Sequence, residues 1–179
     1  MDFHKDFHQD FFALFGLPRG YRLDRSELEH RYHEIQAQVH PDKHAGGTEA
    51  DRRLAMQWAT RVNEAYQTLR EPLARARYLL HLAGIELDRS GALPAEFLLQ
   101  QLEWREAVEE ARTGADVSEL EHLHRRLSQE MDEQYQQLAA AFDDTAKIDY
   151  AHVGDRVRRL MFQEKLLFEI DDALASVEA

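Results

Sequence analysis

The sequence predicts an all-α protein with an N-terminal helical hairpin, whose loop reads His-Pro-Asp, and a C-terminal antiparallel three-helix bundle. Strand-like alternation of apolar and polar residues is nearly absent from the 179 residues, and turn formers are few, with 8 glycines and 4 prolines. Apolar residues recur instead at steps of three and four, which is the spacing of one helix face. A hydrophobic content of 44% is enough for one or two small domains with cores of their own.

The hairpin surrounds His40-Pro41-Asp42, which Lys43 follows directly. Apolar positions at helical spacing lie on both sides of this tripeptide: Leu28, Tyr32, Ile35 and Val39 before it, and Leu54, Trp58, Val62, Ala65, Tyr66 and Leu69 after it. Proline disfavours helical geometry in the preceding residue and has no N–H, so the first helix is expected to end near Val39. Thr48 offers an N-cap for the second helix. We expect a rigid corner that displays one imidazole and one carboxylate to solvent.

A shorter helical segment begins at Pro72 and ends near Gly84, and turn residues without a helical stripe follow it. The predicted organisation is an N-terminal domain over 1–84, whose first eight residues are an extension without an assigned role, a linker over 85–93 and a bundle over 94–179. Short loops join three long amphipathic patterns in the bundle, at about 95–112, 117–143 and 150–177. The apolar stripes of the last two patterns are Leu120, Leu123, Leu127, Met131, Leu138 and Phe142, then Val153, Val157, Leu160, Leu167 and Leu174.

Charge is divided unequally between the two halves. Residues 1–83 hold 12 acidic and 12 basic residues, whereas the remainder holds 22 acidic and 10 basic residues and carries the whole net charge of −12. The acidic half would repel a phosphate backbone, so we expect no nucleic-acid partner. No apolar run approaches the roughly 20 residues of a membrane span, and the N-terminus lacks the apolar region of a signal peptide. We therefore expect a cytoplasmic protein that has no membrane partner.

Catalytic and metal-binding motifs are not found. The chain has no cysteine, which excludes disulfides, thiolate catalysis and cysteine-ligated zinc or iron–sulfur clusters. It also has no Gly-rich phosphate loop and no serine in a nucleophile elbow. The histidine pairs, such as His30 and His33, lack the third and fourth ligands that a metal site needs. We expect no enzymatic activity, no cofactor and no metal site.

The segment 95–112 carries more apolar surface than a bundle helix needs. Its core stripe consists of Phe97, Trp104, Val108 and Ala111. At about 100° per residue, Leu98, Leu99 and Leu102 lie roughly 100° to 160° around the helix from that stripe, and Glu103 and Glu106 flank them. This second face either packs on the N-terminal domain or another bundle helix, or forms a docking patch with an apolar centre and a carboxylate rim. Phe162, which is off the core stripe of the last helix, could extend such a patch.

Several segments resemble those of known families. Val62-Asn63-Glu64-Ala65-Tyr66-Gln67-Thr68-Leu69 resembles the third-helix signature of J domains, and Asp10-Phe11-Phe12-Ala13-Leu14-Phe15-Gly16-Leu17-Pro18 resembles their first helix and its exit. From about Asp10 to Val177 the chain resembles the HscB family, the J-type co-chaperones of iron–sulfur cluster assembly. The segments specific to that family are Pro72-Leu73 with Arg75-Ala76 and Tyr78-Leu79-Leu80, then 97–106 and 159–166.

The resemblance implies two partners. The J domain would engage a DnaK-class chaperone of the HscA type and stimulate its ATPase, through His40, Pro41, Asp42 and Lys43 with help from Arg25 and Arg31. The bundle would bind an iron–sulfur scaffold protein of the IscU type. The scaffold-binding positions of the family correspond to Leu98, Leu99, Leu102, Glu103, Arg105, Glu106 and Phe162.

The helix before the loop, Glu27 to Val39, departs from the J-domain pattern, because Arg31 is its only certain cation and Ala37 and Val39 replace a basic and an aromatic residue. Two alternatives stay open at this point. One is a J-domain co-chaperone whose bundle carries a different client. The other is a helical adaptor without chaperone coupling, in which the His-Pro-Asp sequence is an ordinary loop.

Overall fold

The computed structural model describes residues 9–40, 46–87, 93–143 and 148–178, and the secondary structure of these residues is all-helical, as predicted. The chain forms two compact units, Met1–Leu79 and Leu80–Ala179, and the boundary between them falls within helix α4. Most of the predicted linker, residues 88–92, lies outside the described residues. None of the helices in the described ranges is long and apolar enough to cross a membrane.

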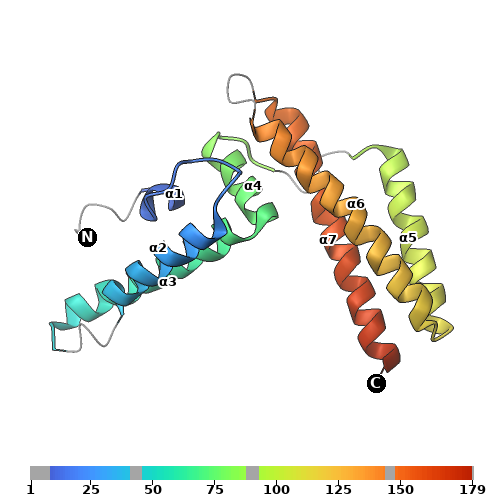
Figure 1. Cartoon of the computed structure of the whole chain (residues 1–179), viewed down its shortest axis with the longest axis horizontal. Coiled ribbons are helices and arrows are strands. Elements are labelled where there is room, and N and C mark those ends of the chain that lie inside the picture. Colours follow the sequence, from blue (N-terminus) through green and yellow to red (C-terminus); the bar gives the residue numbers. More distant parts are fainter. Residues whose placement is uncertain (1–8, 41–45, 88–92, 144–147, 179) are drawn as a thin grey trace. The chain divides into compact units, whose positions relative to one another are not determined.

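The first unit is organised around an antiparallel helical hairpin, in which α2 (Arg25–Val39) pairs with α3 (Glu49–Arg70) (Figure 1). Leu28, Ile35 and Val39 are buried in the seam, and so are Trp58, Val62, Ala65, Tyr66 and Leu69, as the periodicity predicted. The prediction was wrong for Leu54, which is only half-buried, because the neighbouring Ala55 takes the buried position in that turn. Tyr32 is half-buried and stacks on Tyr66 with 4.1 Å between ring centroids, while its hydroxyl donates to Asn63 Oδ1 at 2.9 Å. These contacts fix α2 against α3 along their length.

Both ends of the hairpin loop are built as the sequence predicted. Helix α2 ends at Val39, and His40 has φ −59° and ψ 129°, the extended geometry that a following proline requires. Thr48 begins α3 with a capping box: its backbone N–H donates to Asp51 Oδ2 at 2.9 Å, and its hydroxyl oxygen accepts from the Asp51 N–H at 3.2 Å. The loop is therefore anchored by a helix end on each side.

Helices α1 (Phe11–Leu14) and α4 (Pro72–Leu82) complete the J-type arrangement. The Phe11 N–H donates to the Tyr78 hydroxyl at 2.9 Å, and the two rings stack at 4.5 Å. Asp10 caps α1 and receives a hydrogen bond from Arg19 at 2.7 Å. Burial alone would raise the pKa of the Asp10 carboxyl, but the hydrogen bonds from Arg19, Ala13 and Phe12 outweigh burial and lower it below 3.8.

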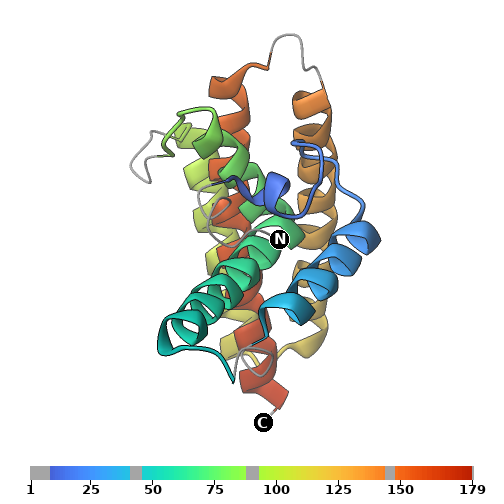
Figure 2. The same cartoon turned by 90° about the vertical axis from the view of Figure 1, so that its left-hand side faces the viewer.

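The second unit is a bundle of α5 (Ala95–Thr113), α6 (Val117–Asp143) and α7 (Tyr150–Glu178), whose bounds agree with the predicted helices to within one residue. The three helices lie side by side, and each runs antiparallel to the next (Figures 1 and 2). The stripes predicted for α5 and α6 are buried: Phe97, Trp104, Val108 and Ala111, then Leu120, Leu123, Leu127, Met131, Leu138 and Phe142.

The stripe predicted for α7 is wrong in its second half. Val153, Val157 and Leu160 are buried, but the core continues through Leu166, Ile170 and Ala173, and Leu167 and Leu174 are only half-buried. The cause is Gln163, which is 1% exposed and occupies the core position after Leu160. A polar residue in the stripe concealed its continuation, so the sequence pattern was extended from Leu160 to the wrong leucine.

Candidate functional site

The tip of the hairpin is the first candidate site, and the described residues reach it from the α2 side. His40 is exposed at the end of α2, whereas Pro41, Asp42 and Lys43 lie outside the described residues. Arg25 is the first residue of α2. At a rise of about 1.5 Å per residue it lies roughly 22 Å along the helix from His40. The structure therefore does not bring Arg25 to the loop, although the sequence analysis grouped the two.

Arg31 is exposed on α2 and pairs with carboxylates of its own helix. Its Nε lies 2.9 Å from Glu27 Oε1, and one terminal nitrogen lies 3.6 Å from Glu34 Oε2. Such exposed pairs contribute less than about 1 kcal/mol each, so Arg31 can exchange these partners for another carboxylate. Helix α2 as a whole has no net positive charge, because its two arginines are outnumbered by three glutamates.

Helix α3 supplies further exposed side chains directly after the loop. Arg52 and Arg53 lie in its first turns, and Arg53 pairs with Glu49 at 3.4 Å. Met56, one turn further along, is also exposed. The sequence analysis searched for cations on the helix before the loop and so did not consider the helix after it.

The outer face of α5 is the second candidate site. Leu98, Leu99 and Leu102 have exposed fractions of 46%, 61% and 53%, whereas the four core positions of the same helix are at most 6% exposed. The alternative in which these leucines pack on another helix of the bundle is therefore wrong. An exposed row of large apolar side chains beside a charged rim is typical of a protein-docking surface.

One part of this face borders α7. The Phe162 ring meets the buried Phe97 ring edge to face, with 6.3 Å between centroids, and Arg105 Nε donates to Glu169 Oε2 at 2.9 Å. At about 100° per residue, Leu98, Leu102 and Arg105 lie within roughly 60° of one another around α5. We call this set, with Phe162, the α7-side face.

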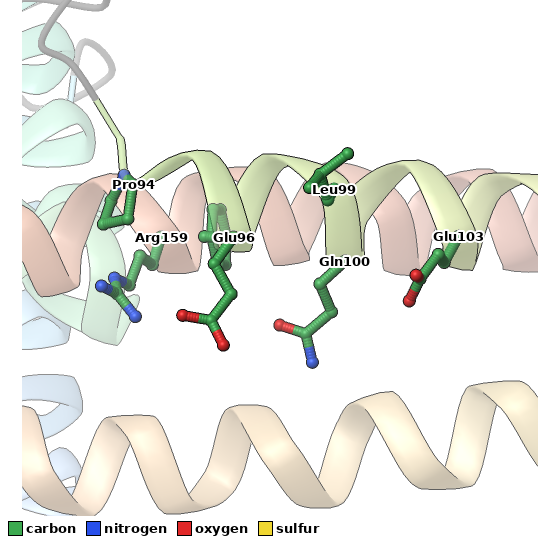
Figure 3. Close-up of a pocket in the computed structure, with 7 residues that line it drawn as sticks. Pro94, Glu96, Leu99, Gln100, Glu103 and Arg159 are labelled. Carbon is green, nitrogen blue, oxygen red and sulfur yellow. The ribbon is translucent and has the colours of Figure 1, made fainter.

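The remaining predicted scaffold residues lie elsewhere on α5. Leu99 and Glu103 line a groove of about 710 Å³, together with Pro94, Glu96, Phe97, Gln100 and Arg159. In Figure 3, Glu96 and Gln100 extend from one side of α5 and Leu99 from the other, with Arg159 near the Pro94 end. Glu106 is exposed, and its helical angle places it between the groove and the α7-side face. A partner that contacts all the predicted residues must therefore wrap around α5.

Two buried amides of the bundle were missed by the sequence analysis. Gln163 Nε2 donates to Glu130 Oε1 at 2.9 Å, whereas neither amide atom of Gln101, which is 2% exposed, has a hydrogen-bond partner among the described residues. The signal was available, because residue 101 fits between Phe97 and Trp104 at the helical spacing of four and three. In the described ranges, no group of three or more His, Asp or Glu is placed to hold a metal.

Comparison with known proteins agrees with this arrangement. The sequence model described as "DnaJ domain" matches residues 10–78, and the one described as "HSCB C-terminal oligomerisation domain" matches residues 93–171. A J domain followed by this bundle defines a J-type co-chaperone, a class of protein that works with an Hsp70-type chaperone. The chain belongs to the HscB co-chaperone family.

Relatives support the assignment over the whole chain. A "Co-chaperone protein HscB homolog" from Azoarcus sp. (strain BH72) is 53% identical over 175 residues, 97% of this chain and 98% of the relative. One from Aromatoleum aromaticum is 51% identical with the same coverage. The solved structure of chaperone HscB from Vibrio cholerae has a TM-score of 0.85 at 34% identity. The match covers 94% of this chain and 99% of the Vibrio cholerae chain. The crystal structure of human co-chaperone protein HscB has a TM-score of 0.86 at 27% identity. The match covers 93% of this chain and 82% of the human chain.

Proposed function

We propose that this protein couples an iron–sulfur scaffold protein of the IscU type to a DnaK-class chaperone of the HscA type in the cytoplasm. It would stimulate the ATPase of the chaperone and deliver the scaffold to it during cluster assembly and transfer. The observation that carries the proposal is the row of exposed leucines on α5 of a chain that belongs to the HscB family. Any ATP hydrolysed would be the chaperone's.

The chaperone-binding surface is proposed to centre on His40, Pro41, Asp42 and Lys43. Because the helix ends on both sides of the loop are ordered, at Val39 and at the Thr48 capping box, the chain that flanks these residues should lose little entropy on binding. Arg31 is the nearer of the two proposed cations on α2 and would exchange its local carboxylates for those of the chaperone. Arg25 would make a separate contact at the far end of the same helix.

The scaffold-binding surface is proposed to comprise both sides of α5. Leu98, Leu99 and Leu102 supply the apolar centre, and Phe162 extends it on α7. Glu103, Arg105 and Glu106 form the polar rim. The acidic character of this half favours a partner with a positively charged surface, because complementary charge speeds association and excludes wrong partners.

The test is a chaperone ATPase assay with purified full-length protein, with and without the scaffold protein. We expect stimulation by the co-chaperone alone and a further increase when scaffold is added. If the stimulation of the ATPase does not change when scaffold is added, and a pull-down shows no binding of scaffold, the result would favour a co-chaperone with a different client. Scaffold binding without any stimulation would favour an adaptor that lacks chaperone coupling.

A further inference from the structure

Arg159 on α7 lies next to two residues of the proposed scaffold-binding surface, and the sequence analysis gives this arginine no role. It lines the α5 groove together with Leu99 and Glu103. Its guanidinium carbon lies 5.4 Å from the centroid of the buried Phe97 ring, and that ring also contacts Phe162 edge to face. Phe97 thus supports a side chain in the groove and another on the α7-side face.

Arg159 differs from neighbouring arginines of α7 in its partners. Arg158 forms an ion pair with Asp155, and Arg156 donates to the Gln137 side chain. The described residues offer Arg159 neither an ion pair nor a hydrogen bond, and the side chain is half-buried. A cation in such a position attracts an anionic group more strongly than a fully exposed one, because solvent screens it less.

The contact with the Phe97 ring also prepares the guanidinium for a specific contact. An arginine whose guanidinium lies over an aromatic ring has lost part of its rotational freedom, and its N–H groups can still donate to a partner. These N–H groups match a carboxylate in a bidentate arrangement. Arg159 is therefore better suited to recognise one oriented carboxylate than to add general positive charge.

We propose that Arg159 is a specificity-determining contact of the scaffold-binding surface, and that it binds a carboxylate side chain of the scaffold protein in the α5 groove. This inference rests on the proposed function. The groove shares Leu99 and Glu103 with the proposed surface, so a partner segment that covers those residues reaches Arg159. The carboxylates of Glu96 and Glu103 line the same groove, and they repel a phosphate group, which carries close to two negative charges, more than a carboxylate, which carries one.

The contact would select for orientation. The rest of the surface is acidic and favours a basic partner without specifying how that partner lies. A single carboxylate that must reach Arg159 rejects basic proteins that lack it, since they leave a half-buried cation without a partner.

The test is the dissociation constant of the purified scaffold protein for the full-length wild type, Arg159→Gln and Arg126→Gln. Arg126 is the matched control, because it stacks on another buried aromatic of α5, with its guanidinium 4.3 Å from the Trp104 ring centroid, but does not line the groove. We expect Arg159→Gln to weaken binding about ten- to a hundredfold, as for the loss of a hydrogen-bonded charge, while Arg126→Gln binds like the wild type. Melting temperatures of the two variants identify any loss that comes from unfolding.

A charge reversal identifies the partner group. Arg159→Glu should abolish most binding, and replacing one Asp or Glu of the scaffold with Arg should restore it. Equal affinity of Arg159→Gln and the wild type, or an equal loss in both Gln variants, would overturn the inference. A wild type that fails to bind scaffold would instead overturn the proposed function, so the two failures are distinguishable.

Discussion

The two proposed binding surfaces are built in different ways. The contacts that hold α2 against α3 come from side chains along the helices, and the Thr48 cap stabilises the start of α3, so the hairpin is stabilised by residues outside its loop. On α5, by contrast, the exposed Leu98 directly follows the core residue Phe97, and Leu102 lies two residues from the core residue Trp104. Function and stability should therefore be separable at His40, which is exposed, whereas on α5 they are separable only by substitutions at the correct helical positions.

The largest expected effect is at the loop. His40→Gln or Asp42→Asn should abolish stimulation of the chaperone ATPase, because each removes a group proposed to contact the chaperone. His40 is the C-cap residue of α2 but its side chain is exposed, and replacing an exposed side chain usually changes stability by less than about 0.5 kcal/mol, so the melting temperature should be unchanged. The measurements are ATPase rate and thermal unfolding of the same preparations. Normal stimulation by either variant, or an unfolded variant, would contradict a purely functional loop.

The next largest effect is on scaffold binding. Replacing Leu98, Leu99 and Leu102 with alanine together should weaken scaffold binding and leave the basal stimulation of the ATPase intact. Because all three side chains are exposed, thermal stability should change little. Leu127→Ala is the contrasting control, since this fully buried side chain of α6 should cost about 2–5 kcal/mol when truncated. A comparable loss of stability in the triple variant would show that the leucines pack in an interface within the chain.

A smaller effect is expected from separating the two halves. Residues 1–84 alone should still stimulate the ATPase, but only at higher concentration, and scaffold should add nothing. Residues 85–179 alone should bind scaffold and compete with the full-length protein. The physical reason is that one chain raises the effective concentration of chaperone at scaffold without any new contact. ATPase titrations with each fragment make the comparison, and an inert or unfolded N-terminal fragment would show that the halves depend on each other.

Much of the fold could be predicted from the sequence, because the periodicity of apolar residues indicates which face of each helix is buried. The helix bounds of the bundle, the Thr48 cap and the core stripes of α5 and α6 all follow from that pattern. The pattern fails where a buried residue is polar, as at Gln163, where the α7 stripe was assigned to the wrong leucines. It also cannot place groups from different helices together, which is why Arg159 and the groove emerged only from the structure.

The contacts and roles of single residues could be predicted only in part. The position of Leu98, Leu99 and Leu102 off the core stripe of α5 was predictable from helical angles, although these angles left open whether the second face packs within the chain or is exposed. The ion pair of Arg105 with Glu169 was not, because the register between two helices depends on the packing of many side chains at once. The binding roles themselves remain predictions from the family resemblance.

The smallest expected effect concerns the buried amide of Gln101, which lies in the core of the same helix that carries the exposed leucines. Gln101→Leu keeps a similar volume and removes two polar atoms that have no hydrogen-bond partner among the described residues. An unsatisfied buried polar group costs about 1–3 kcal/mol, so the variant should be more stable by up to that amount. For a protein of this size, each kcal/mol raises the melting temperature by about 2–4 °C.

Gln163→Leu provides the matched control in the same core. The amide oxygen of Gln163 also lacks a partner in the part of the chain that the structure describes, but its nitrogen donates to Glu130. The substitution therefore removes a hydrogen bond and leaves a half-buried carboxylate without that donor. It should therefore gain less stability than Gln101→Leu, or lose some. Both variants should bind scaffold like the wild type, because neither side chain reaches the surface. A lower melting temperature for Gln101→Leu would mean that its amide is hydrogen-bonded in solution, and that this core position contributes to stability through its polarity.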